Sequence, residues 1–209
     1  MSNMVTVIQT DLDGLELVNR GKVRDLYDLG DALLIVTTDR VSAFDVILPT
    51  AIPGKGGVLT AMSEFWFGLL DDLVPNHLIT TDVDAMGPAV APHAALLRGR
   101  SMMVRKAEPL PVECVVRGFI TGSGWKDYQA SGEICGIPVR AGMQQAEAFS
   151  RVLFTPATKA ETGHDENIDF ATFWRIVGPE TGERLRELSI AIYEKGREHA
   201  RERGIILAD

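Results

Sequence analysis

The chain has 209 residues, of which 45% are hydrophobic and 24% are charged, and its formal net charge is −8. Such a length and composition are typical of a globular protein with one large domain or two small lobes. The acidic balance argues against broad nucleic-acid binding, which usually needs a basic surface, and no apolar run approaches the ~20 residues that a membrane-spanning helix needs.

The N-terminus and the cysteines indicate a cytoplasmic protein. Residues 1–10 lack the basic start and apolar block of a signal peptide. Cys114 and Cys135 stand at neither metal-ligand nor redox spacing, so a reducing compartment is expected. Cys114 falls in an apolar stretch and is predicted to be a small core residue.

The first half of the chain predicts a unit rich in β-strands. Strands are expected at 15–18, 22–29, 33–38, 78–81 and 101–106. Residues 49–57 predict a loop rich in proline and glycine, and the helical spacing of apolar residues over 59–73 predicts a helix packed on a core. Prolines within 108–111 break the pattern, so a connector between two lobes is expected there.

The second half opens with its most informative segment, the run 110–124. An apolar strand in this run is followed at once by a Gly/Ser turn, and a helix is expected over about 125–130. A turn and a short strand are expected over 132–139. The stretch 154–168 is predicted to be irregular and polar.

Two helices and a strand are predicted at the end of the chain. Asp169 is suited to cap a helix over 170–177. Pro179 suits the first turn of a long helix that runs to about residue 203 and stops at a glycine. The last five residues, 205–209, are predicted to form an apolar strand.

Arg117 and Ser123 form a candidate phosphate seat. Arg117 ends the apolar strand and offers a planar fork of donors, and Ser123 lies in the turn where a helix begins. The start of a helix adds unpaired N–H groups and the positive end of a dipole. The alternative is a structural ion pair between Arg117 and a carboxylate, for example that of Glu113, which shares its strand face.

The segment 21–27 is a weaker phosphate candidate. A turn at Gly21 enters a strand that carries Lys22 and Arg24. Backbone amides near the glycine and the Lys22 ammonium can approach phosphate oxygens. The spacing is not that of a Walker P-loop, and the alternative is a solvated hairpin with surface charges.

Polar residues also follow the predicted strand 33–38. Asp39, Arg40 and Ser42 stand where open α/β sheets place ligand groups, although a helix cap or a turn would use the same residue types. Lys55 stands in the next loop, which either contacts a phosphate or carboxylate or serves as a linker.

The segment 158–167 is the most densely polar part of the chain. It combines a lysine, three carboxylates, an imidazole and an amide within ten residues. Such a loop could hold Mg²⁺ through one or two oxygens, or grip the amine and carboxylates of an amino acid. The alternative is a solvated acidic loop. A zinc site is disfavoured because no second Cys or His lies at ligand spacing.

Taken together, these segments resemble the SAICAR synthetase (phosphoribosylaminoimidazole-succinocarboxamide synthase) family. The resemblance covers essentially the whole chain, and 110–123 matches a long and specific family signature. The matching segments are 21–25, 39–45, 52–56, 110–123, 155–161 and 164–167.

The resemblance implies a reaction and a fold. Family members are ligases of purine biosynthesis that use ATP and Mg²⁺ to join L-aspartate to the carboxylate of CAIR, giving SAICAR, ADP and phosphate. The implied fold is α+β, two-lobed and kinase-like or ATP-grasp-like. A β-rich ATP-binding lobe is expected over 1–108 and an α/β substrate-binding lobe over 109–209. The expected partners are these small molecules, with neither nucleic acid nor membrane.

The resemblance also implies roles for individual residues. Contacts to ATP are expected from Gly21, Lys22, Val23, Arg24, Lys106 and Glu108. Contacts to the other substrates are expected from Asp39, Arg40, Ser42, Asp45, Lys55, Arg117, Gly122, Ser123, Lys159, His164 and Asp165. Catalytic roles are expected for Lys22, Lys159 and Asp165.

Family members continue with an Asp-x-Lys-hydrophobic-Glu-Phe-Gly segment, whose first residues correspond to 207–209 here. The resemblance implies that the continuation supplies carboxylates for the ATP-bound metal. Two alternatives to the ligase stay open. One is a nucleotide- or ribotide-binding fragment without catalysis, and the other is a different ATP-dependent ligase or small-molecule kinase on the same scaffold.

Overall fold

The computed structural model describes residues 6–44, 46–159 and 165–209. The chain forms two compact units, Met1–Glu108 and Pro109–Asp209. The described helices include none that is both long and apolar enough to cross a membrane.

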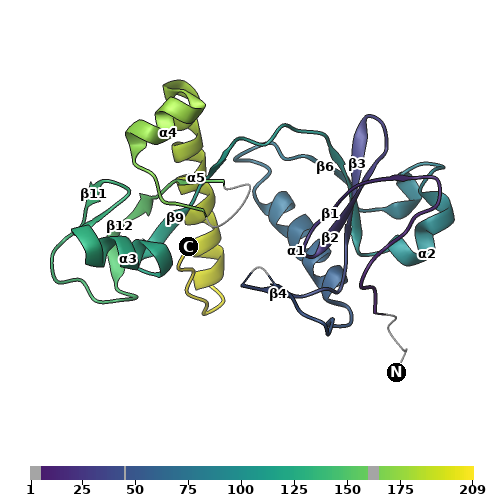
Figure 1. Ribbon diagram of the computed structural model, residues 1–209, viewed down its shortest axis with the longest axis horizontal. Helices are drawn as coiled ribbons and strands as arrows, with labels where there is room; N and C mark the ends of the chain where they lie inside the picture. Colours follow the sequence, from purple (N-terminus) through teal and green to yellow (C-terminus); the bar gives the residue numbers. More distant parts are fainter. Residues whose placement is uncertain (1–5, 45, 160–164) are drawn as a thin grey trace. The chain divides into compact units, whose positions relative to one another are not determined.

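The first unit is built on a five-stranded antiparallel sheet (Figure 1) with the order β1-β2-β3-β7-β6. Its strands are β1 (Glu16–Arg20), β2 (Arg24–Asp28), β3 (Ala32–Thr37), β6 (Leu78–Thr80) and β7 (Ser101–Arg105), and a separate hairpin joins β4 (Ser42–Ala43) and β5 (Val46–Ile47). Its helices are α1 (Lys55–Leu69), η1 (Val83–Ala85), η2 (Ala91–His93) and α2 (Ala94–Leu97). One face of the sheet buries Tyr27, Leu34 and Val36 against Val83 and Leu97.

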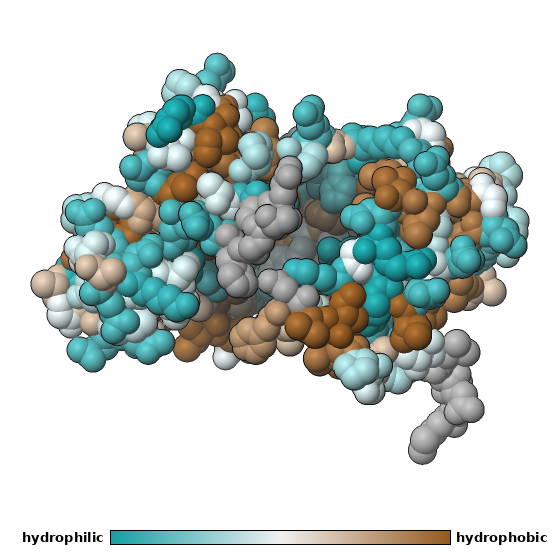
Figure 2. All heavy atoms as spheres, viewed as in Figure 1, coloured by the Kyte–Doolittle hydropathy of each residue, from teal (hydrophilic) through white to brown (hydrophobic). Residues whose placement is uncertain are grey.

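The α1 helix differs from its prediction. It starts at Lys55, within the predicted loop, because Gly54 adopts a left-handed conformation (φ 79°) that turns the chain into the helix. Only Gly56 and Thr60 of α1 are buried, whereas Met62 and Phe65 are about half exposed. The predicted helix is therefore present and contacts β3 and β7, but its predicted apolar face is only partly buried. Figure 2 shows apolar surface in the region of the β4–β5 hairpin, where Val46 and Ile47 are also exposed.

The second unit places a short antiparallel sheet between two layers of helices and hairpins. Its strands are β8 (Val112–Glu113), β9 (Val116–Phe119), β10 (Glu133–Ile134), β11 (Ile137–Pro138), β12 (Ala148–Phe154) and β13 (Ala157–Thr158). Its helices are α3 (Gly122–Ser131), α4 (Phe170–Val177) and α5 (Pro179–Arg201). The β9–β12 pair packs on α5 (Figure 1). Val116 and Phe154 face Phe173 and Tyr193 in one core cluster, while Ile120 and Leu153 belong to a second cluster with the β10–β11 hairpin.

Local capping signals correctly predicted the two C-terminal helices. The Asp169 carboxylate accepts a hydrogen bond from the Thr172 amide (2.7 Å) at the start of α4. Pro179 occupies the first turn of α5, where its missing N–H costs nothing. These boundaries depend on contacts within a few residues, so they are readable from sequence.

Two predictions for the second unit are wrong, and one strand was missed. Cys114 is exposed because it lies in the break between β8 and β9, and the buried cysteine is Cys135. Residues 205–209 form no strand, and Ile206 is 78% exposed, although the Gly118 amide donates to the Ala208 carbonyl (2.9 Å). The seven-residue strand β12 was not predicted, because polar residues interrupt its apolar pattern.

Gly118 allows β9 to pack directly against α5. A Cβ atom at this position would lie 2.0 Å from the Tyr193 hydroxyl oxygen and 3.0 Å from its Cζ. We expect Gly118→Ala to lower the free energy of unfolding by about 1–3 kcal/mol, because the buried Tyr193 ring must shift. Urea denaturation measures this loss, and the additional change Tyr193→Leu should recover part of it. Gly68→Ala, where nothing lies within 4 Å, is the control and should not destabilise the chain.

Candidate functional site

Arg117 is a buried arginine within β9 (Val116–Phe119) rather than at its end, and three side chains contact its guanidinium. Only 5% of the residue is exposed. Its Nε donates to the Thr155 hydroxyl (3.1 Å), its Nη2 donates to the Ser123 hydroxyl (2.8 Å) and its Nη1 contacts an Asp209 carboxylate oxygen (3.2 Å). Two of these partners are neutral and the Asp209 side chain is 48% exposed. Asp209 thus pairs with the guanidinium from a half-exposed position, and an anion that reaches Arg117 would compete with this carboxylate.

The start of α3 lies beside this guanidinium. Gly122 and Ser123 are its first two helical residues and are exposed, and the preceding Thr121 side chain does not cap the helix. A Cβ on Gly124 would lie 3.2 Å from the Arg117 Cδ, so glycine lets the helix start approach the arginine closely. The predicted pairing of Arg117 with Ser123 at a helix N-terminus is present in the structure. This combination of a guanidinium, a hydroxyl and helix N–H groups suits a phosphate.

Thr155, Asn167 and Asp127 also belong to this site, although none of them was among the predicted site residues. Thr155 is fully buried and fixes the Arg117 Nε while its own hydroxyl donates to the Val115 carbonyl (3.2 Å). Ser123 donates to the Asn167 side-chain oxygen (3.3 Å), and the Asn167 amide donates to Asp127 (2.6 Å). Asp127 follows Ser123 by one helical turn, a spacing that could have indicated a shared face.

The Lys159 ammonium forms an ion pair with the Glu113 carboxylate. Its Nζ lies 3.2 Å from a Glu113 carboxylate oxygen, across the paired strands β8 and β13. Glu113 is thus the partner of Lys159 and not of Arg117, whose carboxylate partner is Asp209 (3.2 Å). The alternative considered from sequence, an arginine paired with a carboxylate, is therefore present, although not with Glu113. Asp165 is exposed, and His164 lies outside the described residues.

Arg40 supports the turn between β1 and β2 through hydrogen bonds to its backbone carbonyls. Its side chain is 9% exposed, and it donates to the carbonyls of Gly21 (2.8 Å) and Lys22 (3.1 Å) and to Ile8 (2.6 Å). Its Nη2 also forms a 2.8 Å ion pair with the fully buried Asp25. The turn that was predicted to approach phosphates is therefore held in place through its backbone carbonyls. The Lys22 side chain is exposed.

Asp39 connects the sheet to the start of α1. Its buried carboxylate accepts hydrogen bonds from the amides of Val7 (2.8 Å) and Gly56 (2.8 Å) and from Arg100 (3.2 Å). Burial by itself acts to raise the pKa of Asp39, but these hydrogen bonds outweigh it and hold the pKa below its usual value. Asp39, which follows β3, thus acts as a cap for the start of α1, one of the two roles considered from sequence.

The depressed pKa of Asp39 makes stability depend on pH. A carboxyl group whose folded pKa lies below its unfolded value of 3.8 stabilises the fold above that pH, and this contribution is lost as pH falls through the folded pKa. We expect Asp39→Asn to weaken the loss of stability below about pH 4. Urea denaturation between pH 3 and 6 measures it, with the exposed Asp31→Asn as control. An unchanged pH slope in Asp39→Asn would contradict this assignment.

The other predicted residues are more exposed. The Lys106 ammonium contacts both carboxylate oxygens of Asp28 (2.8 and 2.9 Å), and Glu108 is exposed at the end of the first unit. Ser42 lies in β4 and Lys55 begins α1, both partly buried, whereas Asp45 lies outside the described residues. Among the described residues, no group of three or more His, Cys, Asp or Glu side chains is arranged to hold a metal ion.

Comparison with known proteins identifies the family of the chain. Residues 17–209 match the family model of SAICAR synthetase. The phosphoribosylaminoimidazole-succinocarboxamide synthases of Trichlorobacter lovleyi and Geobacter sulfurreducens are both 56% identical over 204 residues. Each match covers 97% of this chain and 69% of the relative.

Solved structures show the same fold. A SAICAR synthase from Saccharomyces cerevisiae in complex with SAICAR is 40% identical with a TM-score of 0.85, covering 97% of this chain and 69% of that one. A type-2 SAICAR synthetase in complex with ADP, 20% identical with a TM-score of 0.71, covers 92% of this chain and 72% of that one and shares the fold. The family-model match and these identities establish that the chain belongs to the SAICAR synthetase family.

Proposed function

We propose that this chain carries out the SAICAR synthetase reaction, in which ATP drives the joining of L-aspartate to the carboxylate of CAIR. The observation that carries the proposal is the Arg117–Ser123 pair at the open start of α3, inside the family's signature segment. It supports recognition of a ribotide phosphate. The reaction belongs to purine biosynthesis, and we place it in the cytoplasm, where free cysteines persist.

The chemistry asks mainly for positioning and for neutralisation of charge. A carboxylate is a poor electrophile, so transfer of the ATP γ-phosphoryl group to the CAIR carboxylate gives an acyl phosphate. The aspartate amine then attacks its carbonyl carbon, and phosphate leaves as the amide bond forms. Oriented cations and N–H groups stabilise such transfers without a covalent enzyme intermediate.

In the second unit we assign Arg117, Gly122 and Ser123 to the ribotide phosphate. The Arg117 fork and the exposed start of α3 supply the donors, and Thr155 positions the guanidinium. Lys159, His164 and Asp165 remain the proposed substrate loop. The Lys159–Glu113 pair is half exposed, so the ammonium can exchange Glu113 for a substrate carboxylate at a cost of about 1 kcal/mol or less.

In the first unit we assign the β1–β2 turn to the ATP phosphates. The exposed Lys22 carries the charge, and Gly21, Val23 and Arg24 remain proposed contacts beside it, although the Gly21 amide already donates to the Arg24 carbonyl (2.8 Å). Lys106 and Glu108 remain proposed contacts of the nucleotide. We assign Arg40 the role of supporting this turn and Asp39 the role of supporting the start of α1. Ser42, Asp45 and Lys55 remain proposed substrate contacts. Mg²⁺ would neutralise the phosphates of bound ATP, and we assign it no ligands here.

Release of ADP tests the proposed function directly. The chain is incubated with ATP, MgCl₂, CAIR and L-aspartate, and each component is omitted in turn. We expect ADP and SAICAR to form in equal amounts only when all components are present. Arg117→Ala should abolish turnover at low CAIR concentration, while Arg175→Ala, an exposed arginine of α4, is the matched control.

Each other outcome of this experiment points to a different function. ADP formation that needs a different acceptor would replace the proposal with another ligase or kinase. Binding of CAIR by calorimetry without any turnover would support the ribotide-binding alternative.

A further inference from the structure

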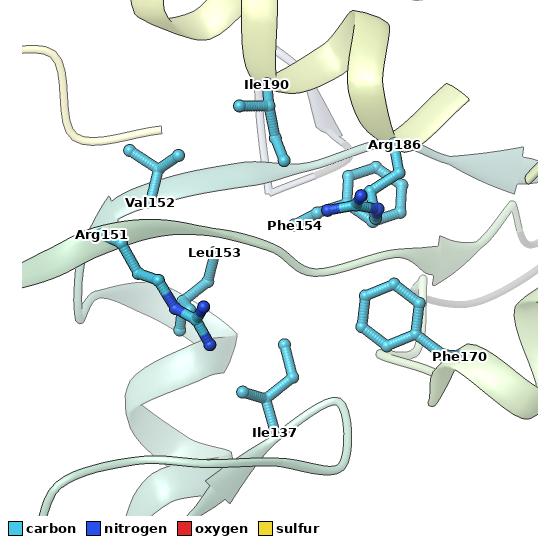
Figure 3. Close-up of a pocket in the computed structure, with 8 residues that line it drawn as sticks. All are labelled: Ile137, Arg151, Val152, Leu153, Phe154, Phe170, Arg186 and Ile190. Carbon is cyan, nitrogen blue, oxygen red and sulfur yellow. The ribbon is translucent and has the colours of Figure 1, made fainter. Parts of the chain in front are cut away.

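A groove in the second unit is lined by none of the residues assigned to a substrate above. One cavity of about 410 Å³ is bounded by β12, α4, α5 and the β10–β11 hairpin. Figure 3 shows its lining residues, which are Ile137, Arg151, Val152, Leu153, Phe154, Phe170, Arg186 and Ile190. A second cavity of about 330 Å³ shares Ile137, Arg151 and Leu153 with it, so the two adjoin along β12. Volumes of this size suit a small ligand.

The groove is mainly apolar, but arginines border it. Arg186 from α5 donates to both carboxylate oxygens of Glu183, and Arg140 beside the second cavity pairs with Glu147. Both of these charges are already balanced. The side chain of Arg151, which lines both cavities, forms no ion pair or hydrogen bond with any described residue. The groove therefore carries one unbalanced positive charge in a chain whose net charge is −8.

A bulge in β12 gives Arg151 its position. Ala148 pairs with Phe119 and Leu153 with Arg117, so residues 149–152 intervene where β9 has only Gly118. Bulges of this kind bend an edge strand and redirect its side chains. In Figure 3 the Arg151 side chain extends from β12 toward Ile137 of the hairpin, on the same side as Leu153.

We propose that this groove binds a small monocarboxylate with an aromatic or aliphatic body. The guanidinium of Arg151 would take the carboxylate through its paired donors. Ile137, Leu153 and Phe170 would cover the apolar body. A single unbalanced charge fits one negative group rather than a polyphosphate, and the interrupted register of β12 disfavours pairing with a further strand.

Calorimetric titration with 2-naphthoate and with its uncharged analogue 2-naphthamide tests the proposal. We expect 2-naphthoate to bind more tightly, and Arg151→Gln to weaken it roughly threefold to fivefold while leaving 2-naphthamide unchanged, as for an exposed ion pair. Arg151→Lys should recover part of the loss. Arg175→Gln is the control, and Ile137→Trp, which fills the groove, should weaken both probes.

Several outcomes would overturn this site. If the two probes bound equally well, Arg151 would not recognise the carboxylate. The same conclusion would follow if Arg151→Gln left binding of 2-naphthoate and the melting temperature unchanged. Self-association that Arg151→Gln or Ile137→Trp reduces in sedimentation velocity would instead make the groove an interface between two copies. The substrates CAIR and ATP are absent throughout, so the result does not depend on the proposed function.

Discussion

Replacing Arg40 with methionine is expected to lower the free energy of unfolding by about 3–5 kcal/mol. Methionine keeps most of the apolar volume of arginine but removes its charge and its hydrogen bonds. The fully buried Asp25 would keep Arg20 (3.3 Å) and Thr10 as partners and lose the shorter ion pair to Arg40 (2.8 Å). The carbonyls of Gly21, Lys22 and Ile8 would also lose their donor. Urea denaturation followed by circular dichroism measures the change.

The matched control for Arg40 is the nearby Arg24. Its side chain is exposed and Arg40 contacts only its backbone carbonyl (3.3 Å), so Arg24→Met should change stability by less than about 0.5 kcal/mol. If Arg40→Met proved as stable as Arg24→Met, the support role would be wrong. Weaker substrate binding at unchanged stability would then return Arg40 to the direct contact that the family resemblance implied.

Replacing Arg117 with alanine is expected to remove most of the affinity for the ribotide. Loss of a partner from a buried, hydrogen-bonded charge pair typically costs about 2–5 kcal/mol, or roughly 30- to 5,000-fold in the dissociation constant. The loss of stability should be smaller, about 1–3 kcal/mol, because the Thr155 hydroxyl keeps its bond to the Val115 carbonyl. Calorimetric titration with CAIR and with SAICAR measures the affinity.

The variant Arg117→Lys separates the contribution of the positive charge from that of the guanidinium geometry. Lysine offers one compact charge and cannot contact Thr155, Ser123 and an anion together, so Arg117→Lys should recover only part of the affinity. Arg175→Ala is the matched control and should bind normally. An Arg117→Ala chain that unfolds but binds CAIR normally in its folded fraction would show that Arg117 is structural.

The sequence predicted those features whose causes lie within a few residues. Capping at Asp169 and Pro179 set the starts of α4 and α5. The apolar runs at β3 and β7 predicted central strands of the first sheet. Where contacts between distant segments decide the outcome, as for the exposed Cys114 or the bulged strand β12, the local pattern was insufficient.

For the candidate site, the sequence alone determined the family and the Arg117–Ser123 pair, because a long motif carries both within one short segment. Only the tertiary structure decided which polar groups are already engaged. Asp39 is bonded to Val7, Gly56 and Arg100, Arg40 to Asp25 and the turn, and Lys159 to Glu113. Such partners lie up to 61 residues apart in the chain, and a charged side chain gives no local sign of the carbonyl or carboxylate that folding will place beside it.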